Sequence, residues 1–130
     1  VWAITVVLSL ACVVSCSKSK ATPQATFLQW AGVPVPNGVT IANSEIEEHA
    51  LDPTCGFELR GPEASLRAII TQLKLIEKDE PTGLRIKFSW MSLNALGEKR
   101  QYFDNIIGSD HVSVWLSENR DVAYMIVANF

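Results

Sequence analysis

Five residues whose side chains can bind a metal or activate a nucleophile lie close together in the middle of the chain. They fall within nine consecutive positions and are Glu47, Glu48, His49, Asp52 and Cys55. A thiolate, an imidazole and carboxylates suit zinc, and a Cys-His-Asp set can supply a nucleophile with its base. The spacing matches no zinc signature, and catalytic triads are usually gathered from separate elements. We therefore interpret this segment as solvated charge and assign it no metal and no catalytic role.

Cys55 can also be considered apart from this segment, and His111 is a further residue with a reactive side chain. The chain has three cysteines, and the other two lie in the N-terminal segment, so an internal disulfide of Cys55 lacks a partner. We interpret Cys55 as a buried small apolar residue, with an intermolecular disulfide or a reactive thiol as alternatives. His111 follows Asp110, and we interpret it as a surface histidine rather than a catalytic base.

Sequence motifs for common enzyme chemistry are absent. The chain has no Gly-x-Ser-x-Gly elbow and no glycine-rich phosphate loop, which are the usual marks of serine hydrolases and nucleotide-binding enzymes. We therefore predict a protein that is not an enzyme and that carries no cofactor. The net charge of −3 gives no electrostatic reason to bind nucleic acid, because phosphate binding needs clustered lysine and arginine.

One helix is predicted over residues 62–76. Pro62 suits a first-turn position, and Glu63 lies near the positive end of the helix dipole. Apolar residues then recur at helical spacing, and they are Leu66, Ile69, Ile70, Leu73 and Ile76.

Strands are predicted around this helix from the alternation of apolar and polar residues. The clearest is 84–90, and 111–116 with 122–130 form a hairpin whose second strand, apolar on both faces, is central. Less regular strands are expected over 39–51, where a helical turn at 44–50 is the alternative, over 56–60, and over 99–107, where a short helix is the alternative. The fold class is therefore α+β, with two layers: one long helix packed on an antiparallel sheet of about four to six strands.

The N-terminal segment is apolar and uncharged through residue 16. A helix of residues 1–14 would be about 21 Å long, shorter than the roughly 30 Å hydrocarbon core of a membrane. This length fits the apolar region of a signal peptide. A basic region should precede it, so we expect either a few further residues upstream of Val1 or a different start of the chain.

The last four residues of this segment resemble a known sequence motif. Val13, Val14, Ser15 and Cys16 resemble the lipobox of bacterial lipoproteins, and the polar residues 17–24 are typical of a tether. The resemblance implies cleavage before Cys16 and lipidation of that cysteine, with several acyl chains for firm anchoring. Ser17 in place of aspartate implies the outer rather than the inner membrane. An ordinary secretory signal, which would release a soluble secreted or periplasmic protein, and a membrane span are the alternatives.

The predicted organisation follows from these segments. Residues 1–15 are a signal peptide, residues 16–26 are the lipidated Cys16 and a flexible tether, and residues 27–130 are a single globular α+β domain.

Three large side chains are candidates for a partner surface. Trp115 should lie on the face of its strand opposite Val112 and Val114. If the helix covers the valine face, Trp115 and Met91 face outward, and exposed tryptophan and methionine are favoured interface anchors. Trp90 is a candidate because Trp90, Met91 and Leu93 continue the strand from Leu84 and cannot all point inward. The alternative is a second layer, such as residues 27–30, that covers them.

These observations favour a non-catalytic interaction module on the bacterial envelope, with a protein partner and a membrane anchor. Its role would be that of an assembly factor, an inhibitor or an immunity-type protein. The second hypothesis is a carrier of a small apolar ligand or lipid, with a cavity lined by Phe88, Trp90 and Tyr124. The third is a thiol enzyme that uses Cys55 with His49.

Overall fold

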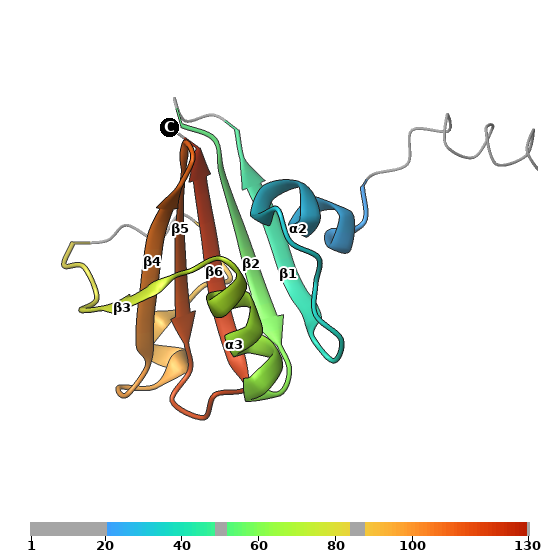
Figure 1. Ribbon diagram of the computed structural model, residues 1–130. Helices are drawn as coiled ribbons and strands as arrows, with labels where there is room; N and C mark the ends of the chain where they lie inside the picture. Colours follow the sequence, from blue (N-terminus) through green and yellow to red (C-terminus); the bar gives the residue numbers. More distant parts are fainter. Residues whose placement is uncertain (1–20, 49–51, 84–87, 130) are drawn as a thin grey trace, which may run out of the picture.

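A six-stranded antiparallel sheet forms the body of the protein (Figure 1). The computed structural model describes residues 21–48, 52–83 and 88–129. Cys16 and the lipobox therefore lie outside the described residues. The helices are α2 (Pro23–Ala31), α3 (Glu63–Gln72) and the short 3-10 helix η1 (Leu93–Leu96). The strands are β1 (Thr40–Glu47), β2 (Thr54–Arg60), β3 (Ile76–Lys78), β4 (Gln101–Ile107), β5 (Asp110–Leu116) and β6 (Val122–Asn129).

The strands lie in the order β1-β2-β6-β5-β4-β3. Every neighbouring pair is antiparallel, and α3 carries the chain from β2 to β3 at the far edge. The predicted hairpin is confirmed as β5 and β6, and β6 is central, as its two apolar faces predict. The strand interpretation of 99–107 and of 39–51 is confirmed by β4 and β1, although residues 49–51 lie outside the described part. The strand predicted over 56–60 begins two residues earlier, at Thr54.

Both helices cover the same face of the sheet (Figure 1), which we call the helix face. Phe27 of α2 and Leu66 of α3 are buried in one apolar cluster with Cys55, Phe57 and Val114 of the strands. The rings of Phe27 and Phe57 meet edge to face, with 5.1 Å between centroids. The α+β class is therefore confirmed, but the expected single long helix is wrong, since two helices of nine and ten residues share this face.

Helix α3 is shorter than the apolar periodicity predicts. It begins at Glu63 and ends at Gln72, and Lys74 adopts a left-handed backbone conformation with φ of 55°. A continuing helix cannot contain this conformation, because it requires negative φ at each residue. Leu75 remains buried although it lies beyond the helix, and Ile76 starts β3.

Helix α2 begins inside the range predicted to be a tether. The side-chain oxygen of Thr22 accepts a hydrogen bond from Ala25 N at 3.1 Å. Pro23 occupies the first turn, where backbone N–H groups have no acceptor within the helix, so the missing N–H of proline costs nothing. Gly32 ends the helix with φ of 77° and donates to the carbonyl of Leu28. The folded part therefore starts at Pro23 rather than at Phe27.

The opposite side of the sheet, which we call the second face, is covered by residues 88–97. Phe88, Met91 and Leu96 are buried there with Trp115 and Tyr124. Residues 84–87 of the strand predicted over 84–90 lie outside the described part. The remaining residues of that prediction form a turn, in which Met91 N donates to the carbonyl of Phe88. Their apolar side chains pack on the second face of the sheet, and their backbone groups do not pair with a strand.

Candidate functional site

Trp115 and Met91, predicted to face a partner, are buried. Trp115 does lie on the face of β5 opposite Val112 and Val114, as the alternation predicts. Its exposed fraction is 1% and that of Met91 is 8%, so neither side chain is offered to solvent. The expected exposure is wrong because residues 88–97 form the second layer, whereas residues 27–30 belong to α2 on the helix face.

Trp90 is half-buried and is held by contacts within the domain. Its Nε1 donates a hydrogen bond to Oε1 of Glu45 at 3.2 Å. Its ring stacks on Phe88, with centroids 5.5 Å apart, and meets Tyr124 edge to face at 6.1 Å. The three rings expected to line a ligand cavity therefore pack against one another.

Cys55 is completely buried on the helix face of β2, with an exposed fraction of 0%. Burial raises the pKa of its thiol to about 12, because a thiolate would lose its hydration in apolar surroundings. The thiolate is the reactive form, and it is essentially unpopulated near neutral pH. The interpretation of Cys55 as a buried apolar residue is therefore confirmed.

The metal-competent residues around Cys55 are divided between the two faces of the sheet. Ile46 lies opposite Cys55 in the β1–β2 ladder and Glu47 lies opposite Thr54, so Glu47 occupies the second face. His49 lies outside the described residues. Within the described ranges, no three histidine, cysteine or acidic side chains gather closely enough to hold a metal ion.

His111 pairs with an acid that its sequence neighbours do not reveal. Its Nε2 lies 3.2 Å from Oδ2 of Asp104, which belongs to the adjacent strand β4. Asp110, the acid considered beside it in sequence, points to the other face of β5, because successive residues of a strand alternate between faces. Cross-strand register places His111 opposite Ile106 and brings Asp104 within reach.

Asp104 is the centre of a polar cluster on the second face. Lys78 Nζ lies 2.5 Å from its Oδ1, and the hydroxyl of Tyr102 donates to its Oδ2 at 2.9 Å. The Tyr102 hydroxyl also lies 3.1 Å from Oγ of Ser113. With His111, these residues form what we call the Asp104 cluster. It joins the three strands β3, β4 and β5.

The charge of this cluster is set by burial and by its donors. Burial alone would raise the pKa of Asp104, but hydrogen bonds from Lys78, Tyr102 and His111 outweigh it and lower that pKa. Burial likewise raises the pKa of Tyr102 to about 12. The cluster therefore contains an ionised carboxylate and a neutral phenol across the physiological range. Chemically it is a fixed anion that holds Lys78 and His111 in place.

Two exposed isoleucines lie beside this cluster. Ile76 of β3 is 57% exposed and Ile106 of β4 is 64% exposed. Ile76 is opposite Asp104 in the ladder, so Ile106, two residues further along β4, is its diagonal neighbour on the same face. We call Ile76 and Ile106 the isoleucine patch. Its edge strand β3 is three residues long.

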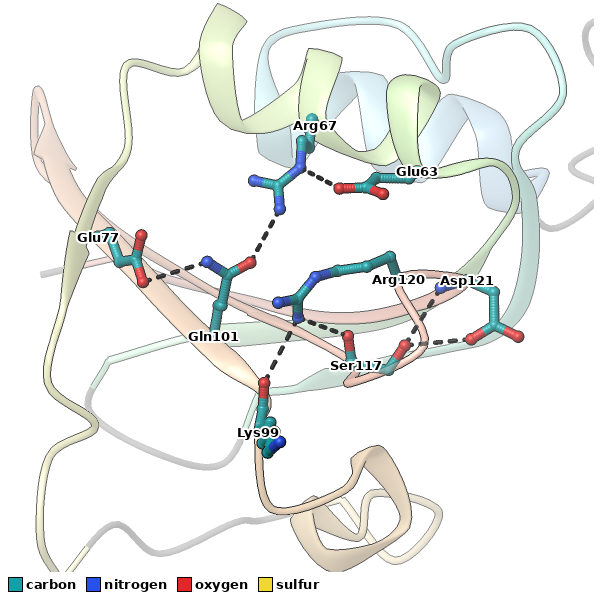
Figure 2. Close-up of polar contacts among 8 residues, drawn as sticks. All are labelled: Glu63, Arg67, Glu77, Lys99, Gln101, Ser117, Arg120 and Asp121. Carbon is teal, nitrogen blue, oxygen red and sulfur yellow. Dashed lines mark hydrogen bonds and ion pairs between the residues drawn. The ribbon is translucent and has the colours of Figure 1, made fainter.

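A second polar network lies where α3 meets the start of β4 (Figure 2). Arg67 donates to Glu63 at 2.6 Å and to the side-chain oxygen of Gln101 at 2.9 Å, and Gln101 donates in turn to Glu77. The same view shows Arg120 donating to the carbonyl of Ser117 in the β5–β6 turn. The contacts of Arg67, Gln101 and Glu77 tie α3 to β3 and β4.

Sequence reasoning missed the Asp104 cluster and the isoleucine patch. Ile76 continues the apolar stripe of the helix, so it was expected in the helix face of the core. Tyr102, Asp104 and Ile106 alternate along one strand face, and this alternation was the signal available for placing them together.

Among the described residues, no helix has both the length and the apolar character needed to cross a membrane. No family model, curated protein or solved structure matches the chain.

Proposed function

We propose that this chain is a lipid-anchored interaction module of the bacterial envelope that binds a protein partner through the isoleucine patch. The main observation behind the proposal is that Ile76 and Ile106 are exposed as diagonal neighbours on one sheet face. Burial of such side chains by a partner is favourable by about 25 cal/mol per Å² of apolar surface.

The surroundings of the patch support a protein partner. Lys78, Asp104 and His111 lie next to it and are fixed by contacts with one another. An apolar centre with a polar, pre-organised rim is the usual composition of a protein interface. The charged groups can form hydrogen bonds with the partner or with water at the rim, while the partner buries the two isoleucines at the centre.

The proposed anchor places limits on that partner. If Cys16 carries lipid, residues 17–22 connect the membrane to the start of α2. Six residues span at most about 20 Å when fully extended. The partner surface must therefore lie close to the membrane, which favours an integral or membrane-bound envelope protein.

Two other functions have less support from the contacts. A carrier of apolar ligands needs a cavity, and the side chains of Phe88, Trp90 and Tyr124 are in ring contact. A thiol enzyme needs an accessible thiolate, and Cys55 is buried with a raised pKa.

Site-specific photocrosslinking tests the proposed surface. A photoreactive phenylalanine analogue replaces Ile106 in the full-length protein, which is expressed in its own envelope and irradiated. The matched control carries the same analogue at Thr71, an exposed position on α3. We expect one protein adduct from position 106 and none from position 71. Equal adducts from both positions, or no adduct from position 106, would contradict the proposal.

The anchor is tested separately in the same cells. Incorporation of an alkyne-labelled palmitate is measured in the natural chain and in a Cys16→Ala variant. We expect label in the first and none in the second. Label in neither chain would remove the lipid anchor from the proposal, and the photocrosslinking result would still decide the partner surface.

A further inference from the structure

A small cavity lies on the helix face, on the opposite side of the sheet from the isoleucine patch. Its volume is about 190 Å³, and it is lined by Gln29, Trp30, Asp110 and Asn129. This volume lies below the roughly 300–1,000 Å³ of sites for drug-sized ligands. The cavity therefore fits one small ring rather than an extended molecule.

Two elements bring the four residues together. Gln29 and Trp30 lie in the last turn of α2, which ends at Ala31. Asp110 and Asn129 are direct partners in the β5–β6 ladder, at its end. Trp30 is partly buried against the apolar cluster of the helix face and also lines the cavity.

The polar side chains of the cavity are exposed or half-buried, so their donors and acceptors can be reached from solvent. Among the described residues, no side-chain hydrogen bond or ion pair engages Gln29, Trp30, Asp110 or Asn129. Two carboxamides can each donate and accept, and a carboxylate accepts. Beside them the indole offers a flat apolar surface with a donor at its edge.

We propose that this cavity binds a neutral pyranose sugar. A sugar hydroxyl both donates and accepts, so it can use Asp110 together with the amides of Gln29 and Asn129. The C–H groups on one side of a pyranose ring form an apolar surface that packs on the Trp30 indole. A simple cation would use the indole and the carboxylate, but it has no acceptor for the N–H donors of the two amides.

The cavity does not distinguish a free monosaccharide from the end of a longer envelope glycan. Both present one pyranose ring of the same chemistry. The site is open to solvent, so the remainder of a glycan would extend outside the cavity.

Ligand-observed saturation-transfer NMR on the full-length protein tests the proposal. The probes are methyl glucopyranoside, methyl galactopyranoside, N-acetylglucosamine and its linear trimer, with tetramethylammonium as the cationic comparison. We expect at least one sugar to bind, with the largest saturation on the ring protons of a single face. Tighter binding of the trimer than of the single sugar supports a glycan as the source, and equal binding supports a monosaccharide.

Variants connect the signal to the cavity. We expect Trp30→Ala to weaken sugar binding about tenfold, which corresponds to about 1.4 kcal/mol, and Trp30→Phe to retain most of it. Asp110→Ala should weaken binding without removing core packing, which keeps the test valid if Trp30→Ala fails to fold. Gln72→Ala, at an exposed residue of α3, is the matched control and should bind as the natural chain does.

Three results would overturn the sugar site. These are no saturation for any sugar, binding of tetramethylammonium alone, or sugar binding that Asp110→Ala, together with Trp30→Ala where it folds, leaves unchanged relative to Gln72→Ala. An Ile106→Ser variant should bind sugar normally, because the isoleucine patch occupies the other face. Failure of the partner surface and failure of the sugar site are therefore distinguishable.

Discussion

Phe88 lies directly over Gly56 of β2. A Cβ atom added to Gly56 would lie 2.5 Å from Cε2 of the Phe88 ring, closer than real contacts allow. The absence of a side chain at Gly56 therefore leaves room for the ring of Phe88. Phe88 is the first residue of the segment 88–97, which covers this face. Phe88 shares its buried cluster on the second face with Trp115 and Met91.

We predict that Gly56→Ala destabilises the protein by about 1–3 kcal/mol, the usual cost of overpacking. The added methyl group must displace Phe88, which is buried. Urea unfolding of the variant measures the change. A Phe88→Leu substitution in the Gly56→Ala background should recover part of the loss, because the smaller side chain no longer meets the methyl group. Additive effects of the two substitutions would contradict direct contact.

The packing of Phe88 over Gly56 could not be predicted from the sequence. The alternation over 84–90 predicts a strand, but Phe88 and Trp90, which lie in its described part, belong to a turn that covers the sheet. Nothing in the composition of residues 88–97 indicates that they pack on top of the sheet. The distinction depends on whether backbone groups join a ladder, and that is decided by contacts distant in sequence.

We predict that Asp104→Asn destabilises the protein at neutral pH by about 1–3 kcal/mol, because it weakens charge-assisted hydrogen bonds in a partly buried site. The folded-state pKa of Asp104 is lowered, and the unfolded value is about 3.9. This contribution is therefore fully present above about pH 4 and is lost as the pH falls through the lowered folded pKa.

The check is urea unfolding between pH 7 and pH 2. The Asn variant should lose less stability on acidification than the natural chain does. Asp52→Asn, at an exposed position, is the control and should follow the natural chain. Parallel acid curves for the natural chain and Asp104→Asn would disprove the role given to the carboxylate.

Cys55 gives a prediction at alkaline pH. Its pKa rises from 9.0 to about 12 in the folded state, so its contribution is complete below about pH 9 and is lost as the pH approaches 12. Cys55→Ala should cost about 1 kcal/mol of packing at pH 7 and should make the alkaline loss of stability shallower. The Cys55→Ala variant should still lose some stability at alkaline pH, because the pKa of Tyr102 is also raised to about 12.

Alkylation measures the same burial directly. Iodoacetamide should modify the peptide that contains Cys55 only slowly in the native protein at pH 8 and rapidly in urea, as read by mass spectrometry. Modification of Cys55 at the same rate in both conditions would show that the thiol is accessible.

The elements with local signals were predictable, and those set by long-range register were not. The β5–β6 hairpin follows from two apolar runs around a polar turn, and the start of α3 follows from Pro62 and Glu63. The end of α3 was misplaced because Ile76 fits the helical stripe as well as it fits β3. The pair of Asp104 and His111 depends on the β4–β5 register, which residue types alone do not specify.

The measurement that tests the central claim most directly is a crosslinking pull-down of the full-length protein from its own envelope. It compares the natural chain with an Ile76→Ser/Ile106→Ser variant and with Leu28→Ser, a control at another exposed apolar residue, on α2. Exposed substitutions change stability by about 0.5 kcal/mol or less, so all three should be folded. The proposal predicts a stoichiometric protein partner that the double variant loses and Leu28→Ser retains. Retention of the partner by the double variant, or no partner with the natural chain, would contradict it.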